Sequence, residues 1–229
     1  MLQKKSPTIM VLKMTVNEIE CVRVCLKSWT ATFKYPSFQS GYQPTLPIPP
    51  LSTIFGILSA VKGEIVGLDD VEFVGYVFRS GGKGIDLETT YRLESGERDI
   101  IKREFLVNNM LYLYLPKEWG EFFKKPKYQI LLGRSCDLAA VDEIKCITLR
   151  TREYPEVWGS IFQIDSGVSG IVHALPVEYD YSAIPRNAKI VKPFILVNFR
   201  KNNPKYNGAL PYDEELDVGV MLYEKSHFG

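Results

Sequence analysis

The sequence predicts an α+β fold, in which one small sheet carries two helices and a long hairpin insertion. Its 14 prolines, 17 glycines and 12% aromatic residues are typical of a chain rich in strands and turns. Apolar residues at every second position indicate strands, whereas one apolar stripe with helical spacing indicates a helix. A glycine-led segment of mixed charge between two strands cannot build its own core, so it predicts a projecting hairpin arm.

The first predicted strand covers residues 21–35, where β-branched and aromatic residues dominate. Its apolar positions are even-numbered at first and become odd-numbered from Trp29 onward. An unbroken strand cannot move its apolar side chains across a sheet. We therefore expect a bulge or break near Lys27-Ser28.

The clearest predicted helix follows a proline-rich loop over residues 36–50. Ser52 has the side chain of an N-cap, and the apolar stripe over residues 54–61 gives the helix a buried face. Gly56 within this stripe is expected to let the helix approach a sheet closely. Gly63 can end the helix in the left-handed conformation.

The next elements are a second strand, the arm over about residues 80–105, a third strand, a short helix and a fourth strand. The strands are expected at Val71–Arg79, Met110–Leu115 and Tyr128–Leu132, and the helix at Lys117–Lys124. In the third strand, leucines alternate with Tyr112 and Tyr114, which predicts two different faces. The order is the βαββαβ plan of a ferredoxin-like, RNA-recognition-motif-type sheet with a β-hairpin thumb inserted between strands two and three.

This plan places the ferredoxin-like domain over residues 14–136. Residues 1–13 precede the first convincing strand and are interpreted as an extension without a function. Residues 137–229 are expected to form a smaller β-rich region packed on the first. Its strands are expected at Glu143–Arg150, Ser160–Ile164, Lys189–Phe199 and Val218–Tyr223.

The charge balance excludes some classes of protein. Lys and Arg number 28 and Asp and Glu 27, for a formal net charge of +1. This excludes a disordered polyelectrolyte and a uniformly basic coat for nucleic acid, but not a local basic face. Lys and Arg outnumber Asp and Glu between Arg79 and Arg134. Residues 186–205 contain Lys and Arg but no Asp or Glu, whereas residues 213–217 are acidic. A solvated surface also explains such a run.

Cysteine, histidine and hydropathy patterns bound the chemistry further. The four cysteines contain no CxxC pair; they are Cys21, Cys25, Cys136 and Cys146. The histidines that could join them as metal ligands are His173 and His227. We expect buried thiols in a reducing cytoplasm, with no disulfide framework, metal site or other cofactor. Only residues 51–61 of the uncharged stretch after Lys34 can be helical, against about 20 residues for a membrane span, so no membrane association is expected.

Three segments carry a resemblance to a known family. Residues 49–58 read Pro-Pro-Leu-Ser-Thr-Ile-Phe-Gly-Ile-Leu, residues 101–106 read Ile-Lys-Arg-Glu-Phe-Leu, and residues 128–135 read Tyr-Gln-Ile-Leu-Leu-Gly-Arg-Ser. In order and spacing they resemble the Pro-Pro-x-Ser-Thr helix start, the basic segment at the thumb base and the Leu-Gly-Arg-Ser strand end of the fifth Cas family of CRISPR-associated proteins. The resemblance covers roughly residues 20–136.

The resemblance implies a function and partners. Members of that family are subunits of type I Cascade, an RNA-guided complex of antiviral defence. They hold the 5′ handle of the CRISPR RNA, and their thumb separates handle from guide. The implied partners are CRISPR RNA, the Cascade backbone subunit and the large subunit, with target DNA reached through the complex. One subgroup, in type I-C systems, also cuts the precursor RNA.

Cleavage of RNA without a metal needs a group that moves protons, which histidine often supplies. The resemblance implies that the cleaving subgroup has a Tyr-Lys-His arrangement, with the histidine beside the lysine. In this sequence Lys102 is followed by Arg103, which stays protonated and cannot act as a base. His173 lies in an apolar run and His227 lies near the end of the chain. We therefore expect no catalytic residue and a non-catalytic RNA-binding subunit. The alternative is a metal-independent endoribonuclease that uses Lys102 with Tyr91 or Tyr112.

Five polar residues are predicted to contact RNA phosphates. Arg134 follows a glycine at a strand end, where its forked donors can reach a phosphate, and Ser135 offers a hydroxyl and an N–H beside it. Lys102 and Arg103 lie where the arm rejoins the sheet and could clamp the strand. Lys83 lies in a glycine-rich stretch whose backbone can approach a phosphate.

Five more residues offer stacking or amide contacts. Tyr91 and Arg92 on the arm could stack on or wedge between bases. Tyr42 could stack in the same way from the loop before the helix. Ser52 and Thr53 present free N–H groups at a helix N-terminus, where a phosphate could bind.

Structural roles explain several of these residues without RNA. Arg134 could form a salt bridge with Asp137 or Glu104. A cap role is sufficient for Ser52, and a tyrosine packed on the surface is sufficient for Tyr42.

Overall fold

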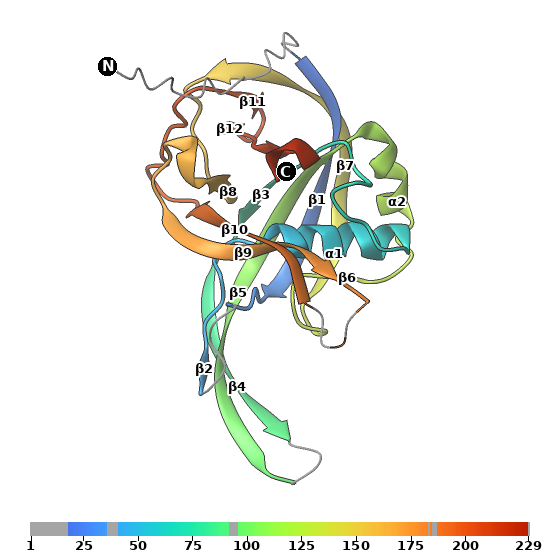
Figure 1. Cartoon of the computed structure of the whole chain (residues 1–229), viewed down its shortest axis with the longest axis vertical. Helices are drawn as coiled ribbons and strands as arrows, with labels where there is room; N and C mark the ends of the chain where they lie inside the picture. The colour runs from blue at the N-terminus through green and yellow to red at the C-terminus, as the bar shows by residue number, and fades with distance from the viewer. Residues whose placement is uncertain (1–17, 36–40, 92–95, 183, 185–186, 229) are drawn as a thin grey trace, which may run out of the picture.

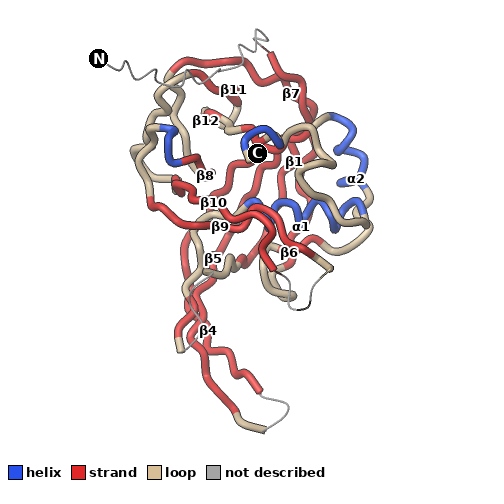
Figure 2. Tube along the Cα trace, viewed as in Figure 1, coloured by secondary structure: helices blue, strands red, loops and turns tan. Residues whose placement is uncertain are grey.

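The computed structural model describes residues 18–35, 41–91, 96–182, 184 and 187–228. The extension over residues 1–13, Arg92 and part of the proline-rich loop therefore lie outside the described residues. The described fold is α+β and dominated by strands that pair almost entirely antiparallel, as expected (Figure 2). No described helix is long and apolar enough to span a membrane.

The centre of the fold is a sheet whose four main strands lie in the order β7-β1-β5-β3 (Figure 1). These strands are β7 (Leu138–Glu153), β1 (Glu18–Ala31), β5 (Arg98–Leu115) and β3 (Val74–Arg79). Each of the three neighbouring pairs is antiparallel. Helix α1 (Leu51–Lys62) follows β1, and a 3-10 turn (Lys117–Trp119) and helix α2 (Gly120–Lys124) follow β5. The predicted positions of both helices are confirmed.

The expected fourth strand is wrong. Within Tyr128–Leu132 only β6 (Ile130–Leu131) is strand, and it pairs with β7. The Tyr128 N–H donates to the Ala60 carbonyl at 2.9 Å, which ties this segment to the end of α1. Because the backbone is held by the helix, the place beside β1 is taken by the much longer strand β7.

The C-terminal part contributes to two sheets. A three-stranded sheet has the order β8 (Ser160–Gln163), β10 (Asn187–Val197) and β9 (Ile171–Asp180), and β9 lies against α1 (Figure 1). The short strands β11 (Ala209–Asp213), β12 (Val218–Gly219) and β13 (Leu222–Tyr223) join the main sheet together with β7. Residues 137–229 are thus β-rich, but they complete the main sheet rather than only packing on it.

Both faces of the main sheet carry buried residues. Alternate residues of β1 and β5 pack against the helices, β9 and β10, and among them are Val22, Val24, Leu26, Leu111, Leu113 and Leu115. The opposite face carries Cys21, Cys25, Tyr112 and Tyr114, which pack with Trp158, Val218 and Val220. The two predicted faces of the third strand are confirmed. The second face is covered around Cys21 and Cys25, whereas an open groove of ≈ 770 Å³ lies over β1, β5 and β7 near Trp29.

Strand β1 is irregular where its apolar parity changes. The ladder with β7 shifts register between Cys25 and Leu26, and Asn108, opposite Trp29 on β5, has a left-handed backbone with φ of 52°. The expected irregularity is confirmed within a few residues. Phe33 joins the core as expected, but Trp29 does not, because 83% of its side chain is exposed.

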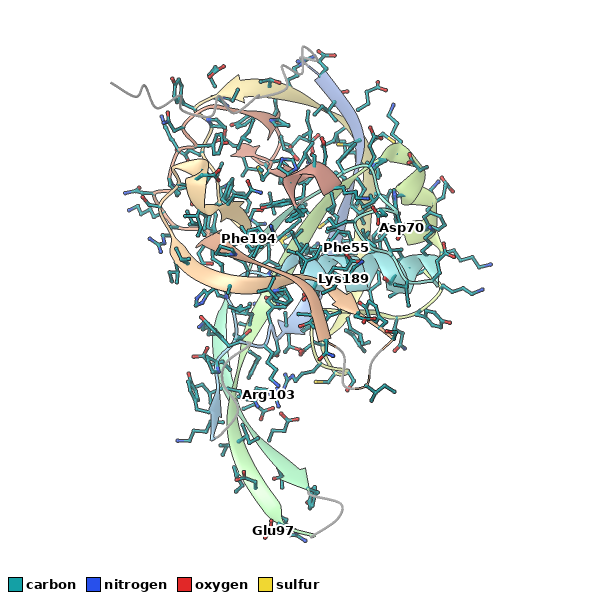
Figure 3. The ribbon with its side chains drawn as sticks, viewed as in Figure 1. Phe55, Asp70, Glu97, Arg103, Lys189 and Phe194 are labelled. Atoms are coloured by element: carbon teal, nitrogen blue, oxygen red, sulfur yellow. The ribbon has the colours of Figure 1, made fainter. Side chains whose placement is uncertain are left out.

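The hairpin arm is formed by β4 (Gly82–Tyr91) and the first half of β5, which pair antiparallel from Gly82–Val107 to Tyr91–Arg98. Strand β5 has 18 residues, so one continuous strand runs from the arm into the middle of the sheet. The short strand β2 (Tyr42–Gln43) pairs with β5 at the base of the arm. Figure 3 places Arg103 near this base and Glu97 at the far end.

All four cysteines are free thiols. Cys21 and Cys25 are buried as expected, and burial raises the pKa of Cys21 to about 12, which keeps it an unreactive thiol. Cys136 and Cys146 are exposed, contrary to expectation, because they lie in a turn and on an open face of β7. In the part of the chain that the structure describes, no three His, Cys, Asp or Glu side chains gather as metal ligands.

Candidate nucleic-acid interface

An open groove of ≈ 580 Å³ lies where the arm meets the sheet, and we call it the arm-root groove. It is lined by the residues that follow β1, the first two turns of α1, β5 at the arm base and strand β9. Four of the residues that the sequence singled out meet there: Ser52, Thr53, Arg103 and Arg134. Lys34 adds a third cation, and no Asp or Glu is among the described residues that line the groove.

Arg103 reaches the groove because side chains alternate along β5. Its cross-strand neighbour on β4 is Asp86, and its Nε forms an ion pair with the Glu88 carboxylate two residues further along β4. The Arg103 side chain is 16% exposed, while that of Glu88 is 39% exposed. The guanidinium therefore lies partly desolvated between an exposed carboxylate and the groove.

Arg134 is held in place by a buried carboxylate. Its Nε and Nη2 donate to the two oxygens of Asp137, each at 3.2 Å, and its backbone N–H donates to Asp137 at 3.0 Å. Asp137 also accepts a hydrogen bond from Thr30 Oγ1 at 2.7 Å, and these donors hold its pKa below the ordinary value although burial raises it. The salt-bridge alternative with Asp137 is thus confirmed, and it positions Arg134 rather than removing it from the groove.

Arg134 keeps its second Nη group for other partners. Nη1 lies 3.7 Å from Asp86, whose side chain is 55% exposed, and the guanidinium carbon lies 5.9 Å from the centre of the Phe105 ring. A fixed fork with one weakly engaged edge is suited to binding a phosphate.

Gly133 brings this arginine against β1. Its φ of 126° and its close approach to the Thr32 carbonyl leave no room for a Cβ atom. The Thr32 N–H donates to the Leu132 carbonyl at 2.9 Å, so the chain before Arg134 is fixed along the end of β1.

The N-terminus of α1 forms another wall of the groove. The helix begins at Leu51 and its N-cap is Pro50, so the predicted cap role of Ser52 is wrong. Proline fits here because its fixed φ is compatible with a helix start and it has no N–H to satisfy. The N–H groups of Leu51 and Ser52 have no acceptor within the helix, as in any first turn, and Ser52 and Thr53 line the groove. The Thr53 N–H donates to the Pro50 carbonyl at 2.9 Å, so the predicted free N–H of Thr53 is wrong.

A second network lies on the other side of the arm base. Glu104 accepts hydrogen bonds from Tyr42 Oη at 2.5 Å, from Lys83 Nζ at 2.9 Å and from the Thr45 N–H at 3.2 Å. Burial raises the pKa of Glu104, but these three donors together hold it below its ordinary value. Tyr42 and Lys83 therefore support the arm base here, and neither is among the residues that line the groove.

The structure separates the remaining predicted residues from the groove. Lys102 is exposed on β5 and points to the face opposite Arg103. Ser135 is exposed in the turn after Arg134. Tyr91 is 61% exposed near the end of β4, where Arg98 lies over its ring at 5.5 Å. Arg92 is outside the described residues.

The groove is also lined by three tyrosines that the sequence patterns did not indicate as site residues. Tyr35 follows β1, and Tyr179 and Tyr181 belong to the end of β9 and the turn after it. Tyr179 and Tyr181 are two residues apart, which is the spacing of a shared strand face, but nothing in the sequence shows that this strand crosses to α1. Buried Thr32 also lines the groove, and its Oγ1 has no hydrogen-bond partner among the described residues.

The residue pairs of the ribonuclease alternative are far apart. Tyr112 is buried in the second core and lies ten residues from Lys102 on the same strand, about 33 Å along it. Tyr91 pairs with Arg98, four residues from Lys102, which is about 13 Å. His173 packs edge-on against Tyr35 with ring centres 5.0 Å apart, and His227 accepts the Glu224 N–H at 3.1 Å.

The described part of the basic run, residues 187–205, contributes no residue to the lining of the groove. Its described lysines lie on β10 and in the loop after it, and Lys189 pairs with Glu178 at 3.4 Å. The acidic residues 213–217 pair instead with cations of β1 and β7, including Arg23 and Arg150. The acidic charges of this region therefore form structural ion pairs.

Comparison with known proteins gives a likeness of fold. No family model and no curated protein matches the chain. A chain of the type III-B Cmr-beta complex bound to cognate target RNA and AMPPnP superimposes with a TM-score of 0.54 at 12% identity, covering 80% of this chain and 86% of that chain. The same complex bound to cognate target RNA gives a TM-score of 0.52 at the same identity and coverage. A chain of a CRISPR RNA-guided surveillance complex gives 0.48 at 16% identity, covering 82% of this chain and 91% of that chain.

Proposed function

We propose that this chain is a non-catalytic RNA-binding subunit of a CRISPR effector complex, and that it holds the 5′ handle of the CRISPR RNA in the arm-root groove. The observation that carries the proposal is the convergence of Arg103, Arg134 and the N-terminus of α1 on one open groove. The three groups come from segments far apart in the sequence. Their shared chemistry is the binding of a phosphate.

The fold supports this assignment. The elements β1, α1, β3, β5, α2 and β7 follow one another in the βαββαβ order of a ferredoxin-like unit, with β7 as the fourth strand and the arm as the thumb between β3 and β5. The likeness to chains of the Cmr-beta complex, whose structures are described as bound to target RNA, agrees with an effector subunit. The sequence motifs favour the type I family.

A phosphate group of RNA can take the place of a carboxylate beside the arginines of the groove. The Asp86 side chain that faces Arg134 is 55% exposed, and exposed pairs contribute only about 0–1 kcal/mol, so a phosphate can displace it at little cost. Glu88 is 39% exposed and its contact with Arg103 is buried, so a phosphate reaches Arg103 from the groove side. Asp137 is fully buried and stays with Arg134, so the arginine keeps its orientation when the outer partner changes.

The two arginines of the groove bind phosphate without moving protons. Arg103 and Arg134 remain protonated, and the two cations can stabilise a phosphate but cannot act as bases. We therefore propose holding without cleavage. The partners proposed are the backbone subunit, the large subunit and, through the assembled complex, the target DNA.

Binding of a handle-bearing RNA by the full chain tests the proposal. A labelled single-stranded RNA with the 5′ handle of the host's own repeat is titrated by fluorescence anisotropy at several salt concentrations. Arg103→Ala and Arg134→Lys should weaken binding, and Arg103→Ala should make the plot of log K against log salt shallower by about 0.7 for each phosphate that the variant no longer neutralises. Arg152→Ala on β7 is the matched control, since this exposed arginine lies far from the groove.

Two results would contradict the proposal. One is RNA binding by the wild-type chain that is undetectable or independent of salt. The other is a discrete product from repeat RNA incubated with the chain in chelator, if Lys102→Ala abolishes that product. The second result would establish the ribonuclease alternative instead.

A further inference from the structure

Helix α1 contains a glycine that no packing contact explains. Gly56 lies in the middle of the helix, is exposed, and would meet nothing within 4 Å if it carried a Cβ atom. The expectation that Gly56 lets the helix approach a sheet is therefore wrong. A glycine inside a helix is destabilising relative to alanine, so an exposed one with free space around it calls for another explanation.

The surroundings of Gly56 suggest one. Gly56 lines the arm-root groove, and it also lines a second open groove of ≈ 340 Å³ on the outer side of α1, which we call the helix groove. Tyr181 lines both grooves as well. The two grooves therefore meet at Gly56 and Tyr181 and follow α1 from its first turn to Gly63, a length of about 18 Å.

The helix groove has the side chains of a single-stranded nucleic-acid track. Tyr128, 62% exposed, and Tyr181 offer rings for stacking. Lys127 lies against Gly63 at the far end, and its backbone N–H donates to the Val61 carbonyl at 3.1 Å. The one carboxylate in the lining, Glu64, is paired with Lys62 at 2.7 Å.

A second observation points to a ligand independently of the helix. Thr32 lines the arm-root groove, is only 6% exposed, and its Oγ1 has no hydrogen-bond partner among the described residues. A buried hydroxyl without a partner is unfavourable unless a bound group satisfies it. The arm-root end of the track thus contains a polar group that lacks its partner.

We propose that the RNA strand continues from the arm-root groove across the bare backbone of Gly56 into the helix groove, where its bases stack on Tyr181 and Tyr128. The proposal rests on the proposed RNA-binding function and adds a path to it. Gly56 is the floor of this path, because any side chain there would stand between the ribose-phosphate chain and the helix. Lys127 provides the cation at its end.

The test uses the opposite effects that the structure predicts for stability and binding. Gly56→Ala should raise Tm by about 2–4 °C, because alanine favours the helix and nothing obstructs its methyl group. Gly56→Leu should keep the fold and lower the affinity for the handle-bearing RNA by about tenfold or more, the decrease expected when one base can no longer stack. Ser169→Leu, which adds the same bulk at an exposed position outside both grooves, should bind like the wild type.

The outcomes separate this path from the function on which it rests. If Arg103→Ala weakens RNA binding but Gly56→Leu does not, the path is wrong and the arm-root site stands. If Gly56→Leu and Lys127→Ala both weaken binding, the path is supported, and separate RNAs with only handle or only guide sequence show which part follows it. If the wild-type chain binds neither RNA, the proposed function and the path both fail.

Discussion

Arg23 on β1 donates from Nη1 to Oδ2 of Asp213 on β11 at 2.8 Å, and the two residues are 190 positions apart in the sequence. Both side chains are less than 5% exposed. Tyr114 Oη donates to the same carboxylate oxygen at 2.9 Å, and Arg23 Nη2 also reaches Glu215 at 2.7 Å. This network fastens the C-terminal strands over part of the sheet face opposite the helices, and it closes that part of the face around Cys21, Cys25 and Tyr114.

Replacing the arginine of this network should destabilise the chain strongly. Arg23→Met leaves Asp213 buried without its cation, so the free energy of unfolding should fall by about 3–5 kcal/mol. Urea denaturation measures the decrease. Arg150→Met, which breaks only exposed pairs, should cost less than about 1 kcal/mol. Arg23→Met combined with Asp213→Leu should recover part of the stability, and no recovery would show that the pair itself is not the cause.

Stability should fall in acid because of Glu215. Lys145 and then Arg23 lower the pKa of this carboxyl group to about 2 in the folded chain, from an ordinary value of 4.5. A lowered pKa in the folded state means that the contribution is complete above the unfolded value and is lost as the pH falls toward 2. Denaturation midpoints between pH 6 and pH 2 should therefore decrease less in Glu215→Gln than in the wild type. Equal slopes would contradict the assignment.

Gly133→Ala should damage both the fold and the groove. Alanine would overlap the Thr32 carbonyl oxygen and would have to adopt a φ of 126°, so a decrease in stability of at least about 2 kcal/mol is expected. The segment that carries Arg134 would move, and RNA affinity should fall with stability. Gly82→Ala, where the new methyl group meets only ordinary contact, is the matched control. A stable Gly133→Ala chain with normal RNA binding would be incompatible with this geometry.

Removing the carboxylates that compete with RNA should strengthen binding. Asp86→Asn frees the outer side of Arg134 and should raise the affinity for handle-bearing RNA by about twofold to fivefold, the value of an exposed pair. Glu88→Gln removes the charge beside Arg103 and should raise the affinity at least as much, because that contact is more buried. Fluorescence anisotropy measures the change. Glu121→Gln on α2 removes the same charge from the surface away from the groove and should have little effect. Equal gains in all three variants would indicate a general charge effect.

The two aromatic residues near the irregular part of β1 should differ in their energetic roles. Trp29→Ala removes an exposed ring and should change the free energy of unfolding by no more than about 0.5 kcal/mol. Phe33→Ala removes a ring that packs on Phe78 in the core, with ring centres 5.3 Å apart, and should cost about 3–5 kcal/mol. Urea midpoints compare the two. A large decrease in stability in Trp29→Ala would mean that this ring is covered.

Local patterns predicted most of the elements. The apolar stripe located α1, the alternation of leucine and tyrosine assigned the two faces of β5, and the polar segment after Gly81 located the arm. The identity of the fourth strand could not be predicted in this way. Tyr128–Leu132 has the apolar run of a strand, but hydrogen bonds to the end of α1 hold part of it, and those contacts are not encoded in the local pattern.

For the candidate site, the residue types and their order could be read from the amino-acid sequence. It identified Arg103 at the arm base, Arg134 after a glycine at a strand end, and the Ser52-Thr53 helix start. Which of these residues share a groove depends on the folded arrangement of the strands and loops. Whether two cations meet depends on strand pairing, twist and the path of distant loops, and these follow from burying both faces of the sheet at once. For the same reason the place of Tyr181 and Gly56 in the grooves could not be predicted from local patterns, because it depends on β9 lying against α1.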